Sequence, residues 1–237
     1  MMPTVLIIAG GEGRRLYPIT KTIPKAMIEL AGEPFIAHQL RMLKNNGVTR
    51  AIICAGYLGE QLKDYIEDGR NFGLKVDFSF DGEKLLGTAG AVKKAFCLLE
   101  DNFAVMYGDS YLTADFEPIS VAFFSSGKKG LMAVLRNNGQ WDTSNVVYAD
   151  GKIVKYSKKH ITPEMKYIDY GLLFFRKEAF AGIAENQVYD LADLCRDLIE
   201  KNQLDGYEVE QRFFEVGSFK GLEETRSYLE KLGSSHV

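Results

Sequence analysis

The chain has 237 residues, of which 46% are hydrophobic, with a formal net charge of −3 and an isoelectric point near 5.7. This length and composition suffice for the core of one large domain, while the slightly acidic balance argues against a general nucleic-acid or acidic-membrane surface. With no apolar run near the roughly 20 residues of a membrane helix and no signal-like start, we expect a cytoplasmic protein that binds neither membranes nor nucleic acids.

The first predicted element is a strand at residues 5–9, followed by a loop rich in glycine and positive charge. Its five apolar residues form the continuous run that is typical of a strand buried on both faces. The strand ends at Gly10, Gly11 and Gly13, where the backbone can approach a ligand with no Cβ in between. The cations that follow are Arg14, Arg15, Lys21 and Lys25. Because exposed N–H groups and guanidinium forks bind phosphate oxygens, the stretch predicts a site for a polyanion.

Spacing excludes the two commonest phosphate-binding loops. A Walker A loop ends in Gly-Lys-Ser/Thr, whereas Gly13 is followed by Arg14. A dinucleotide fingerprint that began at Gly11 would need a third glycine at the position of Leu16. A Gly-Gly pair after a strand is often only a turn, so the loop by itself leaves that alternative open.

Strands and helices alternate through the rest of the first half. Strands are predicted at residues 27–30, 51–55, 74–80 and 103–107, and helices at residues 34–47, 57–67 and 88–99. Residues 74–80 alternate strictly between apolar and polar side chains, which is typical of a strand with one polar face. This order predicts a mostly parallel sheet with helices on both faces, as in a Rossmann-like three-layer α/β domain.

The second half has a less regular pattern. Strands are predicted at residues 131–135, 145–149, 152–157, 167–175 and 212–216. Asp150-Gly151 is a strong hairpin signal between two of them. Helices are predicted after Asp190 and around Leu222, Leu229 and Leu232. No linker separates two domains, so we expect a single domain over residues 1–237 with a mixed, mostly parallel central sheet.

Two further motifs lie where strands meet helices. Gly87 and Gly90 flank the predicted start of a helix, where free N–H groups can contact a base or a ribose. A plain helix cap by Thr88 is an equally good interpretation. Asp109 follows the strand at 103–107, and ligands of parallel sheets lie outside the carboxyl ends of strands. Since Mg²⁺ prefers carboxylate and phosphate oxygens, Asp109 is the first candidate metal ligand.

The opening loop resembles the signature of the sugar-1-phosphate nucleotidyltransferases. The matching residues are Ala9-Gly10-Gly11-Glu12-Gly13-Arg14-Arg15-Leu16, Pro18, Thr20, Pro24 and Lys25. The resemblance implies the nucleotide-diphospho-sugar transferase fold, with a nucleotide-binding half at residues 1–110 and a sugar-phosphate-binding half at residues 111–237. It also implies transfer of a nucleotidyl group from an NTP to a sugar 1-phosphate with Mg²⁺, which yields an NDP-sugar and pyrophosphate.

The resemblance assigns roles to particular residues. Arg15, Lys25 and Asp109 are the expected catalytic residues, and Asp109 is expected to hold the metal together with Glu215. The family has aspartate at the position of Glu215, and the extra methylene leaves direct and water-mediated coordination open. The implied nucleotide contacts are Ala9, Gly10, Gly11, Gly13, Arg14, Glu83, Gly87 and Thr88. The implied acceptor contacts are Asn145, Lys159, Asp169 and Gly171, with Lys159 fitting the family spacing better than Lys158.

Two other functions remain as alternatives at this point. One is a cytidylyltransferase for a non-sugar phosphate or phosphonate, which the family-like run at residues 86–91 disfavours. The other is a non-catalytic nucleotide-binding relative, which the presence of Arg15, Lys25 and Asp109 disfavours. The sequence does not indicate which base or which sugar is used, and it is compatible with a homodimer.

Overall fold

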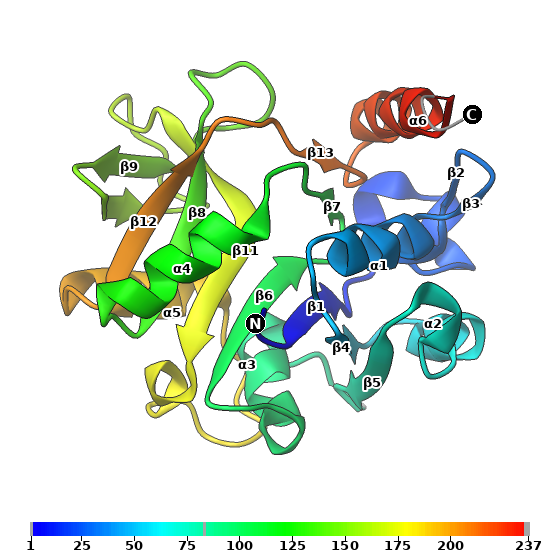
Figure 1. Ribbon diagram of the computed structural model, residues 1–237, viewed down its shortest axis with the longest axis horizontal. Helices are drawn as coiled ribbons and strands as arrows, with labels where there is room; N and C mark the ends of the chain where they lie inside the picture. The colour runs from blue at the N-terminus through cyan, green and yellow to red at the C-terminus, as the bar shows by residue number, and fades with distance from the viewer. Residues whose placement is uncertain (1, 83, 235–237) are drawn as a thin grey trace.

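The fold is organised by a mixed sheet to which both halves of the chain contribute (Figure 1). The computed structural model describes residues 2–82 and 84–234, and within them the sheet has nine strands in the order β5-β4-β1-β6-β11-β8-β12-β10-β9. Glu83, one of the predicted nucleotide contacts, lies outside the described residues. Among the described helices, none combines the length and hydrophobicity that a membrane crossing needs.

The first half forms the parallel part of the sheet, as predicted. Its strands are β1 (Val5–Ala9), β4 (Arg50–Ala55), β5 (Lys75–Phe80) and β6 (Asn102–Tyr107). β1 lies between β4 and β6, and β5 pairs with β4, all in parallel. The connecting helices are α1 (Phe35–Asn45), α2 (Gly59–Ile66) and α3 (Gly87–Lys94). The predicted strand at 27–30 is reduced to β2 (Glu29–Leu30), which pairs with β3 (Glu33–Pro34).

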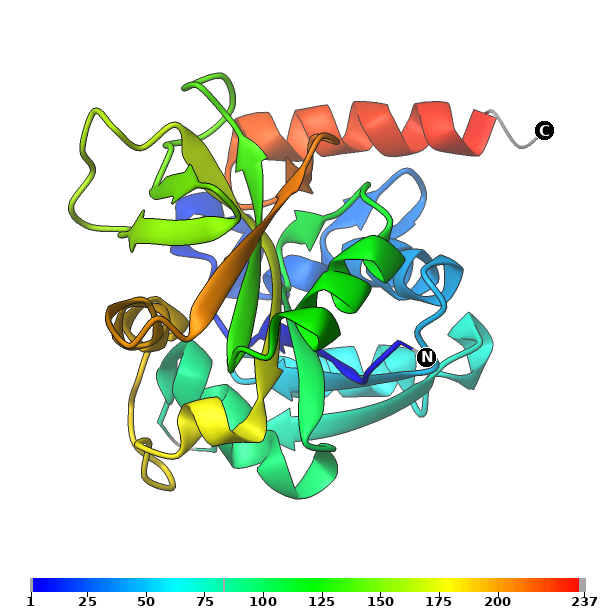
Figure 2. The same ribbon diagram turned by 60° about the vertical axis from the view of Figure 1, so that its left-hand side comes forward.

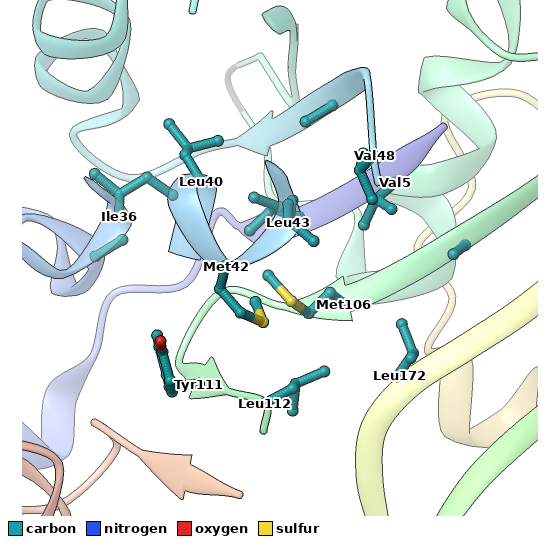
Figure 3. Close-up of a cluster of buried hydrophobic side chains, with 14 of the residues drawn as sticks. Val5, Ile36, Leu40, Met42, Leu43, Val48, Met106, Tyr111, Leu112 and Leu172 are labelled. Carbon is teal, nitrogen blue, oxygen red and sulfur yellow. The ribbon is translucent and has the colours of Figure 1, made fainter. Parts of the chain in front are cut away.

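Apolar side chains fill both faces of the sheet and produce the predicted three layers. Along β1, Val5 and Ile7 belong to the core on one face and Leu6 to the core on the other, because successive side chains of a strand alternate. The first face is covered by α1, α2, α4 (Phe116–Ser126) and α6 (Phe219–Ser234). Figure 3 shows α1 on this face, with Leu40 and Leu43 directed toward the sheet. The second face is covered by α3 and α5 (Leu191–Glu200).

The second half makes the sheet mixed. Its strands are β8 (Gly130–Arg136), β9 (Val146–Ala149), β10 (Lys152–Tyr156), β11 (Tyr167–Arg176) and β12 (Leu204–Val209). β11 runs antiparallel to both β6 and β8, whereas β12 runs parallel to β8. The hairpin β9–β10 turns at Asp150-Gly151 with φ of 51° and 76°, which confirms the turn signal.

In the second half of the chain, three further elements differ from the sequence predictions. Helix α4 was not predicted, although Asp115 is an N-cap whose side chain accepts a hydrogen bond from the Glu117 N–H at 2.9 Å. Strand β12 was not predicted either. The strand predicted at 212–216 contracts to β13 (Phe214–Glu215), which leaves the main sheet and pairs with β7 (Ser110–Tyr111). Helix α6 then returns beside the β2–β3 hairpin (Figure 2).

Candidate active site

Two adjoining pockets lie at the carboxyl ends of β1 and β6, where the parallel sheet predicts a ligand site. The β1 pocket has a volume of about 270 Å³ and is bordered by the end of β1 and the glycine loop. The β11 pocket has a volume of about 510 Å³ and extends from the end of β6 toward β11 and β13. The two pockets share Tyr107, Asp109 and Lys158. A larger hollow of about 880 Å³, between the β2–β3 hairpin and the end of α6, includes none of the predicted site residues.

Only part of the glycine loop lines the β1 pocket, and its other glycines shape the loop itself. Ala9 and Gly11 line the β1 pocket. Gly10 packs against the neighbouring loop, since a Cβ there would lie 3.2 Å from the backbone nitrogen of Gly56. Gly13 has a φ of 63°, and its carbonyl accepts a hydrogen bond from the Thr20 hydroxyl at 2.8 Å. Gly10 and Gly13 therefore shape the loop and do not border the β1 pocket.

Arg14 and Arg15 point in different directions. Both lie in a single 3₁₀ turn, Arg14–Leu16. The Arg14 guanidinium pairs with Glu12, and its side chain is 76% exposed, so the structure places it outside both pockets. Arg15 lines the β11 pocket, and its Nη2 lies 2.7 Å from the position of a Cβ on Gly217. Arg15 thus extends from the glycine loop to the turn that follows β13.

Lys25 and Asp109 form an ion pair at the junction of the two pockets. Lys25 Nζ lies 2.7 Å from Asp109 Oδ2, with side-chain exposures of 19% and 27%. Burial disfavours the ionised form of Asp109, but the charges of Lys25, Lys158 and Arg15 outweigh it and hold the pKa of that carboxyl below its ordinary value. Asp109 is therefore ionised at neutral pH.

A buried glutamine supports the turn that carries Asp109. Gln39 of α1 is fully buried, and its Nε2 donates hydrogen bonds to the carbonyls of Ser110 at 2.8 Å and Tyr107 at 3.3 Å. These carbonyls stand on either side of Asp109 in the sequence. Sequence reasoning missed Gln39 because a polar residue within an amphipathic helix gives no sign of what it contacts.

The ribbon β7–β13 brings the late motif next to Asp109, as the resemblance implies. Glu215 pairs with Ser110 in the register of this ribbon, and the Val216 N–H donates to the Asp109 carbonyl at 2.8 Å. The Glu215 carboxylate also belongs to its own turn. One oxygen accepts a hydrogen bond from the Ser218 hydroxyl at 2.6 Å, and the other accepts from the Gly217 N–H.

Asp169 and Asn145 line the far wall of the β11 pocket. Asp169 is 6% exposed, and its carboxylate accepts hydrogen bonds from Tyr107 at 2.7 Å, Tyr156 at 2.8 Å and the Gly171 N–H at 3.0 Å. Asn145 Oδ1 accepts from the Asp169 N–H at 2.9 Å. Gly171 itself has a φ of 87° and lies outside the pocket lining, so its role is to turn β11 where the register shifts.

The structure puts Lys158, and not Lys159, in the pocket wall. Lys158 lines both pockets, and its ammonium lies 3.1 Å from the Tyr107 hydroxyl oxygen. Lys159 is exposed and lines neither pocket, and its backbone N–H donates to the Ser157 hydroxyl at 3.2 Å. Family spacing pointed to Lys159, but spacing does not fix the direction in which each side chain of this turn points.

Comparison with known proteins decides the family. A family model described as nucleotidyl transferase matches residues 4–231. The chain belongs to this family. The resemblance noted in the opening loop is thereby confirmed, and it extends over nearly the whole chain.

The relatives of this chain are named after several different sugar phosphates. This chain is 31% identical to N-acetylmuramate alpha-1-phosphate uridylyltransferase of Neisseria meningitidis, over 94% of this chain and 96% of that protein. It is also 31% identical to UTP–glucose-1-phosphate uridylyltransferase of Synechocystis sp., over 82% of this chain but only 55% of that protein. D-glycero-alpha-D-manno-heptose 1-phosphate guanylyltransferase of Campylobacter jejuni is 23% identical over 90% of this chain and 93% of its own.

Solved structures confirm the predicted fold. HddC from Yersinia pseudotuberculosis superposes with a TM-score of 0.81 at 23% identity, over 96% of this chain and all of that one. A UDP-glucose pyrophosphorylase complexed with UDP-glucose superposes with a TM-score of 0.77 at 19% identity, over 98% of this chain and 99% of that one. The chain is an α/β protein of the nucleotide-diphospho-sugar transferase fold.

The carboxylates that line the β11 pocket fit Mg²⁺ better than a metal held entirely by protein ligands. Among the described residues, no group of three or more His, Cys, Asp or Glu side chains could hold a metal ion. Asp109 and Glu215 nevertheless supply two hard oxygen donors to the lining of the β11 pocket. Mg²⁺ is usually bound by one or two carboxylates together with substrate phosphates, so the donor set fits this ion.

The start of α3 differs from the expectation that its N–H groups are free. The Tyr189 carbonyl accepts from the N–H groups of Ala89 at 2.9 Å and Gly90 at 3.0 Å. Thr88 lines the β1 pocket, but its hydroxyl accepts from the Leu191 N–H at 2.7 Å and so caps α5. A Cβ on Gly87 would lie 2.7 Å from the Tyr189 carbonyl oxygen. The two glycines are thus explained by close packing against residues 187–190.

Proposed function

We propose that this chain transfers a nucleotidyl group from an NTP to a sugar 1-phosphate and releases pyrophosphate. The observation that carries the proposal is the position of the Lys25–Asp109 ion pair between the two pockets. One pocket adjoins the glycine loop, and the other is lined by polar side chains suited to a sugar phosphate. The full-length match to a sugar-1-phosphate uridylyltransferase supports the same assignment.

In this proposal the reacting phosphates meet at Asp109. The NTP lies along the β1 pocket, with its α-phosphate near Lys25, and the acceptor occupies the β11 pocket with its phosphate near Lys158. A phosphate oxygen of the acceptor attacks the α-phosphorus in line, and pyrophosphate leaves from the opposite side. The acceptor phosphate is already ionised, so this step needs no side-chain nucleophile or base.

Catalysis then consists of positioning and charge stabilisation. Lys25 stabilises the crowded α-phosphate, while Arg15 and Lys158 add positive charge from the β11 pocket. Asp109, with Glu215 beside it, would hold Mg²⁺, which when bound neutralises charge on the phosphate oxygens. A cytoplasmic location and a homodimer stay predictions from the sequence.

Pyrophosphate release should identify the substrates. With Mg²⁺, we expect one productive combination when GTP, UTP, CTP, dTTP and ATP are crossed with the 1-phosphates of glucose, mannose, N-acetylmuramic acid and D-glycero-D-manno-heptose. Nucleotide binding that shifts the melting temperature without turnover would point to another acceptor, including a non-sugar phosphate or phosphonate. The proposal would be contradicted if the protein showed no turnover and bound no nucleotide.

Lys158 and Lys159 form a matched pair for testing the acceptor pocket. Lys158→Ala should raise KM for the acceptor about tenfold, because a cation that lines both pockets is lost. Lys159→Ala should change it less than twofold, since this exposed side chain lies outside both pockets. Initial-rate kinetics at saturating NTP measures both values. The reverse order of effects would restore the assignment that family spacing suggested.

A further inference from the structure

A hydrogen-bonded series of side chains leads from the protein interior to the Lys158 ammonium. Its inner end is Asp169 of β11, which is 6% exposed and accepts the hydroxyls of Tyr107 and Tyr156 on the same oxygen. Its outer end is Lys158, whose Nζ lies 3.1 Å from the Tyr107 hydroxyl oxygen and 4.3 Å from the centroid of the Tyr107 ring. Tyr107 is the last residue of β6 and comes two positions before Asp109.

The direction of each hydrogen bond follows from the groups involved. An ammonium can only donate, so Lys158 donates to the Tyr107 oxygen. A carboxylate can only accept, so the Tyr107 hydroxyl donates its hydrogen bond to Asp169. The Tyr107 hydroxyl therefore donates to Asp169 while its oxygen accepts from Lys158.

Asp169 has little capacity left to accept hydrogen bonds from the hydroxyls of a sugar. Its two oxygens already accept three hydrogen bonds, from Tyr107, Tyr156 and the Gly171 N–H. The polarisation of the Tyr107 hydroxyl by Asp169 makes its oxygen a better acceptor for a cation. The face of the Tyr107 ring adds a cation–π contact to the same ammonium.

We propose that Tyr107 is a positioning residue that holds the Lys158 ammonium between the two pockets, and that Asp169 acts through Tyr107. This inference rests on the proposed function and names how its acceptor site is organised. Lys158 is otherwise an exposed side chain with four rotatable bonds, on a turn that follows β10. Fixing its ammonium beforehand lowers the entropy lost when the acceptor phosphate binds.

The chain offers a matched pair of variants for this test. Tyr107→Phe and Tyr156→Phe each remove one hydroxyl from the same oxygen of Asp169, at 2.7 Å and 2.8 Å, and each keeps the aromatic ring. Only Tyr107 also contacts Lys158. A purely structural role of these hydroxyls predicts similar effects of both variants, whereas positioning of Lys158 predicts an effect of Tyr107→Phe alone.

The kinetic experiment is a double-mutant cycle with Lys158→Met. We expect Tyr107→Phe to lower kcat/KM for the acceptor about fivefold and Tyr156→Phe to lower it less than twofold. In the Lys158→Met background, Tyr107→Phe should have no further effect. Equal effects of the two tyrosine variants, or an undiminished effect of Tyr107→Phe without Lys158, would overturn the proposal.

An NMR measurement separates this inference from the proposed function. With lysine carrying ¹³C at Cε, Lys158 should show a ring-current-shifted resonance, assigned by its absence in Lys158→Met. Tyr107→Phe should move this resonance toward those of exposed lysines, and Tyr156→Phe should leave it in place. If Tyr107→Phe leaves the chemical shift of Lys158 unchanged, the positioning role is refuted. If the wild-type protein shows the expected chemical shifts but has no activity, only the proposed function is refuted.

Discussion

Lys25→Ala is expected to lower kcat/KM by roughly two to four orders of magnitude, the loss expected if this side chain supplies a few kcal/mol to the transition state. Lys25 Nζ lies 2.7 Å from Asp109 Oδ2, and both side chains are largely shielded from water. The substitution removes a cation from the α-phosphate and also leaves a shielded carboxylate without its closest counter-charge. Steady-state kinetics with the productive substrate pair measures the loss.

The pH profile of the same variant gives a second readout. Lys25 is the strongest of the charges that lower the pKa of Asp109. Without it, burial favours the neutral carboxyl, so the pKa of Asp109 rises. Activity requires ionised Asp109 and is lost as the pH falls through the pKa of this carboxyl. This loss should therefore occur at a higher pH in Lys25→Ala than in the wild type.

The control is Lys21→Ala, which removes a neighbouring cation of the same segment. Lys21 lies over the Tyr17 ring and lines neither pocket. We expect its activity to remain within twofold of the wild type. A loss below tenfold for both Lys25→Ala and Asp109→Ala would contradict the catalytic roles given to this ion pair.

The parallel half of the fold was readable because its signals are local. The apolar run of β1 and its glycine loop occur within a few residues. The antiparallel β9–β10 hairpin of the second half was readable for the same reason, because its left-handed turn is encoded by the two residues Asp150 and Gly151. Such features depend on the identity of neighbours in the sequence, which a single chain displays directly.

The missed elements depend on contacts between distant residues. Helix α4 is apolar on most sides and exposes Val121 and Phe124, so it lacks the one-sided periodicity by which helices are recognised. Strand β12 carries Gly206 at its centre, which weakens the strand pattern. A Cβ there would lie 2.6 Å from the Tyr148 ring and 2.7 Å from Ile153, so the glycine is required by the hairpin packed on it.

The candidate site shows the same division. The sequence indicated Lys25, Asp109 and Glu215 through their motifs, and the structure brings them to one region. The sequence could not reveal that Tyr107 connects Lys158 to Asp169, because these residues meet only when β6, β10 and β11 assemble.

Glu215→Gln should separate the charge of this residue from its structural contacts. The amide can still occupy the turn beside Ser218 and Gly217, so we expect the melting temperature to stay close to that of the wild type. Loss of the negative charge removes one of the two carboxylates available to Mg²⁺. We expect kcat/KM to fall about 100-fold and the half-saturating Mg²⁺ concentration to rise about tenfold, the effect of losing a few kcal/mol. Activity titrated with Mg²⁺ measures both.

Two companion variants decide how Glu215 acts. Ser218→Ala removes the 2.6 Å hydrogen bond to the carboxylate but keeps the charge, so Mg²⁺ dependence should be retained. Glu215→Ala removes charge and turn contacts together, so both the melting temperature and activity should fall. If Glu215→Gln keeps wild-type activity while Glu215→Ala loses it, the carboxylate only holds the turn before α6. Asp109 would then be the one carboxylate of the pair that the metal requires, since Asp109 and Glu215 both line the β11 pocket.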